Sequence, residues 1–303
     1  MIAHRIGSRQ SQRLEYDVAM RRRSFLNTVA GAATAAAGAQ SLSGAQTTKR
    51  TGRLKQAICG GVFRGSGLDM EGMCREAARL GVLGFDLRGP EHFPVLKKHG
   101  LVPTMVGGGS GIKAGINDKS LHNEIEERMR KAIQATADAG APNVIVMAGD
   151  RKGISDEVGA DNSVAFLNKV KGMAEDLGVN LCIELLNSKV NHPGYMADHT
   201  AWGVDVCKRV DSPRVGLLYD IYHMQIMEGD VIRTIRDNIK YILHFHTAGN
   251  PGRHEFDDTQ ELNYVGIATA IADLGFEGYL AHEYTPTKDP IPTLDKMLSI
   301  CDV

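Results

Sequence analysis

The sequence has almost no excess of charge of either sign. Its 303 residues include 35 lysines and arginines and 36 aspartates and glutamates, which gives a formal net charge of −1 at pH 7. Both signs are spread along the chain, and no basic stripe is visible. Proteins that bind nucleic acid usually concentrate positive charge on one face. We therefore expect no nucleic-acid partner.

Cysteine is scarce, and long apolar runs are missing. The five cysteines show no Cys-x-x-Cys spacing, their number is odd, and several lie in apolar segments. This pattern predicts buried thiols rather than a disulfide framework. After residue 50, no segment has the ~20 consecutive apolar residues of a membrane-spanning helix. No membrane span is expected.

The N-terminal segment differs in composition from the rest of the chain. Three arginines at 21–23 precede a weakly hydrophobic stretch rich in alanine and glycine at 29–39. Cleavage is expected after Ala39 or Ala45, where small residues recur. A basic start, an apolar middle and a small-residue end are typical of an export signal. The alternative is a disordered basic tail with an alanine-rich helix.

The arginines also indicate the export route. Residues 22–26, Arg-Arg-Ser-Phe-Leu, resemble the twin-arginine motif, whose pathway carries folded proteins. Met20 directly precedes the arginines, so residues 1–19 are interpreted as an upstream extension. The prediction divides the chain into residues 1–50, an extension with a twin-arginine-type signal peptide, and residues 51–303, a barrel domain that is exported to the periplasm.

Beyond the N-terminal segment, short apolar runs alternate with helical patterns. Eight strand–helix pairs in about 250 residues match a (β/α)₈ barrel, and continuous apolar strands indicate a parallel sheet covered on both faces. An open doubly wound sheet is the alternative, but no Gly-x-Gly-x-x-Gly follows the first strand. We predict an α/β protein with a single TIM barrel. The expected strands are 56–63, 84–87, 101–106, 143–148, 180–186, 215–220, 241–247 and 278–284, and the expected helices are 69–80, 91–99, 123–139, 163–177, 199–210, 229–238, 264–274 and 291–301.

Four of the expected strands carry a metal-type ligand near the C-terminal end: Glu184, Asp220, His246 and Glu283. In a barrel of parallel strands these ends meet at one mouth, where active sites lie. Each residue alone has an ordinary structural explanation, such as a buried ion pair or a turn cap. Four at successive strand ends predict a site for one divalent cation. Three carboxylates and one imidazole suit Mn²⁺ or Mg²⁺, then Co²⁺, and suit zinc less well.

Two long polar loops, 187–198 and 248–262, would stand over the same mouth. Their side chains would place cationic and hydrogen-bonding groups around a small hydroxy-keto acid or sugar. A loop arginine would hold a carboxylate in a bidentate fork. Solvated loop residues are the alternative. The expected substrate-binding residues are Lys189, His192, His223 and Arg253.

Three motifs carry a family resemblance. They are Glu-Leu-Leu-Asn-Ser at 184–188, Tyr-Asp-Ile-Tyr-His-Met-Gln at 219–225 and Ala-Gly-Asn-Pro-Gly-Arg-His-Glu at 248–255. With them the chain resembles the xylose-isomerase-like barrel superfamily of sugar isomerases and epimerases, and within it the hydroxypyruvate isomerase family. The resemblance implies metal ligands at Glu184, Asp220, His246 and Glu283, acid-base glutamates at Glu184 and Glu283, and substrate contacts at His223 and Arg253.

The resemblance further implies an isomerase that transfers a proton through an enediolate. A cation would polarise the carbonyl of an α-hydroxy-carbonyl substrate. Glu184 or Glu283 would remove the carbon-bound proton, and the same or the opposite glutamate would return it. The expected partner is a small molecule, and a homo-oligomer is also considered.

Three other functions stay open. An exported ketose 3-epimerase is favoured by His246, because hydroxypyruvate isomerases usually carry glutamine at that position. An apurinic endonuclease of the same superfamily would need a multi-metal site richer in histidine and a basic surface. A non-catalytic sugar-binding barrel with a structural metal would exchange no proton between solvent and its ligand.

Overall fold

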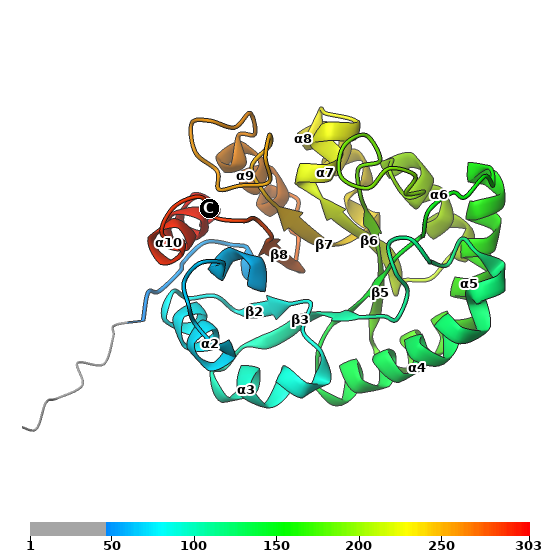
Figure 1. Cartoon of the computed structure of the whole chain (residues 1–303), viewed down its shortest axis with the longest axis horizontal. Helices are drawn as coiled ribbons and strands as arrows, with labels where there is room; N and C mark the ends of the chain where they lie inside the picture. The colour runs from blue at the N-terminus through cyan, green and yellow to red at the C-terminus, as the bar shows by residue number, and fades with distance from the viewer. Residues whose placement is uncertain (1–46) are drawn as a thin grey trace, which may run out of the picture. The chain divides into compact units, whose positions relative to one another are not determined.

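The computed structural model describes residues 47–303, which form a closed barrel of eight parallel strands paired in the order β1 to β8 (Figure 1). This confirms the predicted (β/α)₈ architecture. The strands are β1 (Lys55–Cys59), β2 (Gly84–Asp86), β3 (Val102–Gly107), β4 (Asn143–Val146), β5 (Asn180–Leu185), β6 (Val215–Asp220), β7 (Ile242–Thr247) and β8 (Tyr279–His282).

Helices surround the barrel on its outer face (Figure 1). They are α2 (Met70–Arg79), α3 (Phe93–Lys98), α4 (His122–Asp138), α5 (Asp156–Leu177), α6 (Thr200–Val210), α7 (Ile221–Met227), α8 (Val231–Asn238), α9 (Tyr264–Asp273) and α10 (Pro290–Ile300). Short 3₁₀ turns lie at Gly60–Phe63, Pro90–His92, Lys119–Leu121 and Ile239–Tyr241.

The predicted boundaries were wrong at several places. The first strand ends at Cys59, because residues 60–63 form a 3₁₀ turn. Helix α5 begins at Asp156, well before the predicted residue 163, because Ser155 caps it by accepting a hydrogen bond from the Val158 amide. Helix α7 was not predicted at all. Strand β8 ends at His282, so Glu283 lies just beyond it.

The inside of the barrel has an apolar layer with a polar layer above it. Side chains of residues two apart in a strand point to the same face. Cys182 and Leu218 pack with Met105 and Ile145 in an apolar cluster. Two residues further along their strands stand Glu184 and Asp220. The same alternation therefore aims the carboxylates into the C-terminal mouth.

Other predictions concern the whole chain. All five cysteines are free and buried, as expected. Within residues 47–303, no helix has the length and hydrophobicity to cross a bilayer. The predicted export signal at 21–39 lies outside the described residues and stays a prediction. Thr48 and Arg50 already contact the barrel domain, through the Arg79 and Leu80 carbonyl oxygens.

Candidate active site

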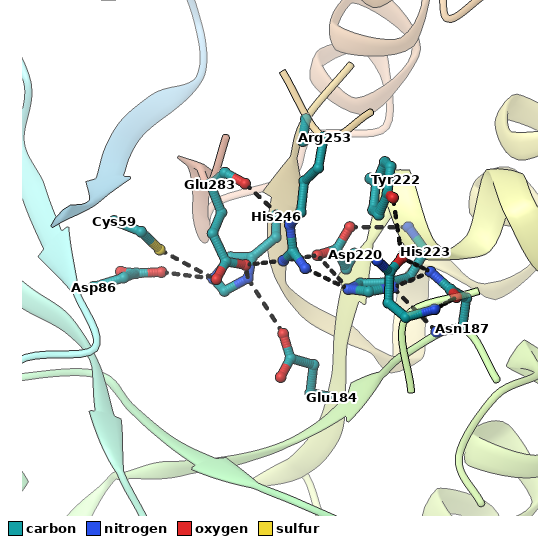
Figure 2. A network of polar contacts seen from close by, with 12 residues as sticks. Cys59, Asp86, Glu184, Asn187, Asp220, Tyr222, His223, His246, Arg253 and Glu283 are labelled. Atoms are coloured by element: carbon teal, nitrogen blue, oxygen red, sulfur yellow. Dashed lines mark hydrogen bonds and ion pairs between the residues drawn. The ribbon is translucent and has the colours of Figure 1, made fainter. Parts of the chain in front are cut away.

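The structure brings the four predicted metal ligands together at the C-terminal mouth of the barrel. Glu184 lies in β5, Asp220 ends β6, His246 lies in β7 and Glu283 follows β8. One potential ligand atom from each residue lies within 4.8 Å of all the others. His246 Nδ1 is 2.7 Å from Glu283 Oε2 and 3.4 Å from Glu184 Oε1 (Figure 2). Strand register contributes directly, because Asp220 is paired with His246.

Asp220 has a structural role in addition to its place in the cluster. Its Oδ1 accepts a hydrogen bond from the His223 amide at 3.1 Å and so caps α7. Its Oδ2 faces the cluster and accepts from Arg253 Nη2 at 3.2 Å. One carboxylate oxygen of Asp220 therefore caps the turn, and the other lies in the candidate site.

Asp86 is a functional residue that the sequence reasoning missed. Its Oδ2 lies 3.0 Å from His246 Nε2 and 2.6 Å from His244 Nε2, and Thr104 Oγ1 donates to its Oδ1. The carboxylate is completely buried at the end of β2. Because a carboxylate can only accept, it places the proton of His246 on Nε2 and leaves the Nδ1 lone pair facing Glu184 and Glu283.

The surroundings of His246 Nδ1 show whether a cation fits this cluster. It is buried and has no hydrogen bond of acceptable geometry, although Glu283 Oε2 is only 2.7 Å away. A lone pair beside two carboxylates is repulsive unless a positive charge lies between them. In the protein alone, a proton provides that charge. Burial lowers the pKa of His246, but Glu283, Cys59 and Asp86 together outweigh burial and hold this pKa well above its usual value. A divalent cation meets the same requirement.

The two glutamates have opposite pKa shifts. Burial raises the pKa of Glu184, and the nearby Glu283 carboxylate adds to the rise. Burial acts in the same direction on Glu283, but His246 and Arg253 outweigh it and lower the pKa of Glu283 to about 2. The surroundings of the two carboxyl groups thus push their pKa values in opposite directions.

Arg253 reaches the cluster from the loop after β7 (Figure 2). Its Nη2 donates to Glu283 Oε2 at 2.7 Å and to Asp220 Oδ2 at 3.2 Å, and its Nη1 lies 2.9 Å from His223 Nε2. On its other side, His223 Nδ1 is 3.1 Å from the Asn187 amide nitrogen. Burial and the Arg253 charge lower the pKa of His223, which keeps the ring neutral.

The remaining predicted substrate residues lie further from the acids. The ring centroid of His192 is 5.3 Å from that of His223, and burial together with Arg253 lowers its pKa. Lys189 Nζ donates to the carbonyl oxygens of Ile226 at 3.1 Å and Met227 at 2.9 Å. These contacts direct the amine to the C-terminal end of α7. The structure does not bring Lys189 into the cluster.

A cavity of about 360 Å³ opens beside Glu283, the one of the four ligand residues that lines it. Its volume suits a small ligand. A larger cavity of about 470 Å³ lies at the opposite mouth of the barrel, lined by Lys55, Asn180 and Tyr279 among others. The smaller cavity is lined by Glu283 and by Asp86 and Arg253, which contact His246 and Asp220, so it is the candidate substrate site. Its lining residues are Cys59, Gly60, Gly61, Arg64, Asp86, Leu87, Arg88, Arg253, Glu283, Tyr284 and Thr285.

Comparison with known proteins gives consistent results. Residues 94–299 match the family model described as xylose isomerase-like TIM barrel. Over 104 residues, the chain is 38% identical to the 2-oxo-tetronate isomerase of Cupriavidus necator, covering 34% of this chain and 39% of the relative. Over 107 residues, it is 34% identical to the hydroxypyruvate isomerase of Escherichia coli, covering 34% and 41%. The chain thus spans about two fifths of the length of these relatives.

Solved structures show the same fold. An AP endonuclease of family 2 from Brucella melitensis superposes with a TM-score of 0.73 at 23% identity, covering 80% of this chain and 97% of that one. A D-psicose 3-epimerase from Clostridium cellulolyticum H10, solved with D-tagatose, gives a TM-score of 0.65 at 22% identity, covering 82% and 96%. At these identities the likeness shows the fold alone.

Proposed function

The chain belongs to the xylose isomerase-like TIM barrel family, and on this premise we propose that it is an isomerase of a small hydroxy-keto acid or sugar. The curated relatives named above, a 2-oxo-tetronate isomerase and a hydroxypyruvate isomerase, support this reaction class. The observation that carries the proposal is the four-residue cluster at the C-terminal mouth, in which Glu184 and Glu283 lie on either side of His246.

Four residues would hold one divalent cation: Glu184, Asp220, His246 and Glu283. The fit rests on the donor set, three carboxylates with one imidazole, and on the Nδ1 lone pair that Asp86 directs at them. Oxygen-rich sets of this kind suit Mn²⁺ or Mg²⁺. When bound, such a cation supplies Lewis-acid polarisation of a carbonyl oxygen.

The protein's own groups would move the proton. Glu283 lines the cavity beside the cluster, so it is placed to accept the carbon-bound proton of a substrate there. Glu184 lies on the other side of His246 and is the second carboxyl group of the pair, so it would return a proton to the neighbouring carbon. Neutral His223, next to Arg253, would hydrogen-bond substrate oxygens.

Solvent proton exchange tests the proposal. In D₂O with Mn²⁺, we expect the full chain to convert hydroxypyruvate into its aldehyde isomer and to incorporate deuterium at carbon. Glu184→Gln and Glu283→Gln should each reduce turnover by about 10²–10⁴-fold, the usual contribution of acid-base catalysis. Glu124→Gln, on the exposed side of α4, is the control and should keep full activity. Near-normal turnover in either glutamate variant would refute the two-glutamate scheme.

A ketose 3-epimerase is the second candidate. His246 favours it, since histidine at this position is the choice expected for the epimerases. Assays of ketoses and hydroxy-keto acids side by side separate the two, because an epimerase would invert a ketose carbon and leave hydroxypyruvate unchanged. If neither class exchanges protons with solvent, a sugar-binding barrel with a structural metal is the better description.

We also propose that residues 21–39 direct export of the chain. The support is compositional, from the paired arginines and the alanine-rich stretch that follows them. Recovery of the protein only from the cytoplasmic fraction of its host would contradict this proposal.

A further inference from the structure

The cavity beside the ligand cluster has an unusual charge distribution. Three arginines line it, namely Arg64, Arg88 and Arg253, together with only two carboxylates, Asp86 and Glu283. Arg64 lies in the turn after β1 and Arg88 in the segment after β2, so neither belongs to the motifs that identify the family. What the cavity can bind depends on which of these five charged side chains already have a partner of opposite charge.

Both carboxylates of the cavity are already engaged. Asp86 is fully buried and accepts from two histidines and a threonine. Glu283 is bound by Arg253 and His246. Arg253 is itself paired with Glu283 and Asp220. The acidic groups therefore leave no negative charge for the other two arginines.

Arg88 and Arg64 have no acidic partner within residues 47–303, where neither forms an ion pair. Arg88 Nε is buried and forms no hydrogen bond with the described protein atoms. A buried guanidinium N–H without an acceptor is costly, and native proteins rarely leave one unsatisfied. Arg88 and Arg64 thus bring to the cavity lining two positive charges that no carboxylate of the described residues pairs with.

The backbone holds Arg88 in this place. Leu87, just before it, has a left-handed φ of 57°, which is uncommon for a residue with a branched side chain and is typical of functional sites. The guanidinium carbon of Arg88 lies 4.6 Å from the centroid of the Phe85 ring. The guanidinium of Arg88 also packs against Gly60, because a Cβ added to Gly60 would come within 1.6 Å of Arg88 Nη2.

We propose that Arg88, with Arg64 beside it, forms a carboxylate-binding subsite and makes the enzyme specific for a hydroxy-keto acid over a neutral ketose. A guanidinium binds a carboxylate through two parallel hydrogen bonds, which fixes both the charge and the orientation of an acid substrate. The inference rests on the proposed isomerase function. It adds the reason why that site would select an acid.

A matched pair of substrates isolates the carboxylate. Hydroxypyruvate and dihydroxyacetone share the hydroxymethyl ketone unit and differ by a carboxylate in place of a second hydroxymethyl group. For Arg88→Gln we expect kcat/KM to fall about 10–100-fold for hydroxypyruvate, mainly through KM, and to stay unchanged for dihydroxyacetone. Arg88→Lys should give an intermediate loss, since it keeps the charge without the fork. Arg233→Gln, which is 77% exposed on α8, is the control.

A second variant, Gly60→Ala, disturbs the Arg88 guanidinium without changing Arg88 itself. In Gly60→Ala the new methyl group would displace the Arg88 guanidinium, which is the movable end of a flexible side chain. We expect the same loss of selectivity with little change in the thermal unfolding midpoint. If Gly60→Ala and Arg88→Gln reduce both substrates equally, or reduce neither, the subsite is refuted.

Binding without turnover separates this inference from the proposed function. Glycerate is an unreactive hydroxy acid, and calorimetry on the full chain should show about 10–100-fold weaker glycerate binding in Arg88→Gln with unchanged Mn²⁺ affinity. A wild-type chain that binds glycerate through Arg88 but isomerises neither substrate would refute the isomerase and keep the subsite. If inorganic phosphate binds at this subsite more tightly than glycerate, the subsite is a phosphate site, and the carboxylate assignment is wrong.

Discussion

His246 shows how one buried carboxylate can set the chemistry of a whole site. Asp86 accepts from Nε2 of both His244 and His246, so the ring of His246 can turn only its Nδ1 toward the acids of the mouth. The Cys59 sulfur lies 4.0 Å from the same Nε2, but burial raises the pKa of this thiol, which makes it a poor ligand in its neutral form. Orientation of His246 therefore depends on Asp86.

Replacement of Asp86 by asparagine tests this dependence. We expect Asp86→Asn to weaken Mn²⁺ binding by about 10–100-fold, the usual cost of losing the carboxylate behind a ligating histidine. The measurement is calorimetric titration of Mn²⁺ into the protein without substrate. Asp273→Asn, an exposed change on α9, serves as the control. Equal Mn²⁺ affinity in wild type and Asp86→Asn would show that His246 is held by other contacts.

At the scale of elements, one ion-pair network fixes the loop that carries His192. Arg151, after β4, donates to both oxygens of the buried Asp198 at 3.0 and 3.1 Å, and its Nε donates to Asp156 at 2.6 Å. Ser188 Oγ also donates to Asp198. The network ties residues 187–198 to the first turn of α5.

The same network makes a pH-dependent contribution to stability. Burial raises the pKa of Asp198, but hydrogen bonds from Arg151, Ser188 and His199 outweigh it, and the folded pKa lies below the unfolded value. Its stabilisation is therefore present above the unfolded pKa of about 3.9 and is lost as the pH falls through the folded value. Asp198→Asn should lower the free energy of unfolding by about 1–3 kcal/mol at pH 7.

Urea unfolding at two pH values checks this expectation. The difference between wild type and Asp198→Asn should shrink as the pH is lowered below the unfolded value of about 3.9, because protonation of the wild-type carboxyl group removes the charge-dependent stabilisation. Asp205→Asn, at an exposed pair on α6, should change stability by less than about 0.5 kcal/mol at either pH. A difference that is constant with pH would rule out a contribution from the charge of Asp198.

Some elements could be predicted from the sequence, and others could not. The alternation of apolar runs was sufficient for all eight strands, because a strand buried on both faces is apolar throughout. The same rule hid α7, whose seven residues are nearly all buried and show no helical period. Asp86 and Arg88 were missed because β2 has only three residues and the turn at Leu87 has no sequence signal. The only clue in the sequence was that Asp86 is a polar residue at the end of a short apolar strand.

At the scale of the whole molecule, a bound cation should stabilise the barrel. Three carboxylates and an imidazole meet where β5 to β8 end, so ion binding is possible only in the folded state. At 100 times its Kd, Mn²⁺ should add about 2.7 kcal/mol. For a domain of this size, that corresponds to a rise of about 5–10 °C in the unfolding midpoint.

Calorimetric unfolding with Mn²⁺ and then with excess EDTA measures the effect. His246→Ala should abolish the rise, whereas His254→Ala should keep it, because His254 bonds to the Thr285 carbonyl oxygen outside the cluster. A midpoint that does not respond to Mn²⁺ in the wild type would mean that these four residues bind no cation, and the metal-dependent part of the proposal would be wrong.

Arg253 has a consequence for how such a protein is assembled. Its guanidinium is bonded to Asp220 and Glu283, two of the four ligand residues, so the mouth already contains a positive charge that belongs to the chain. One guanidinium offsets part of the negative charge of these two carboxylates, so their repulsion is reduced without an ion from outside. The same positive charge repels a cation that enters the mouth, so Arg253 lowers the affinity for an ion while it helps the empty barrel to fold.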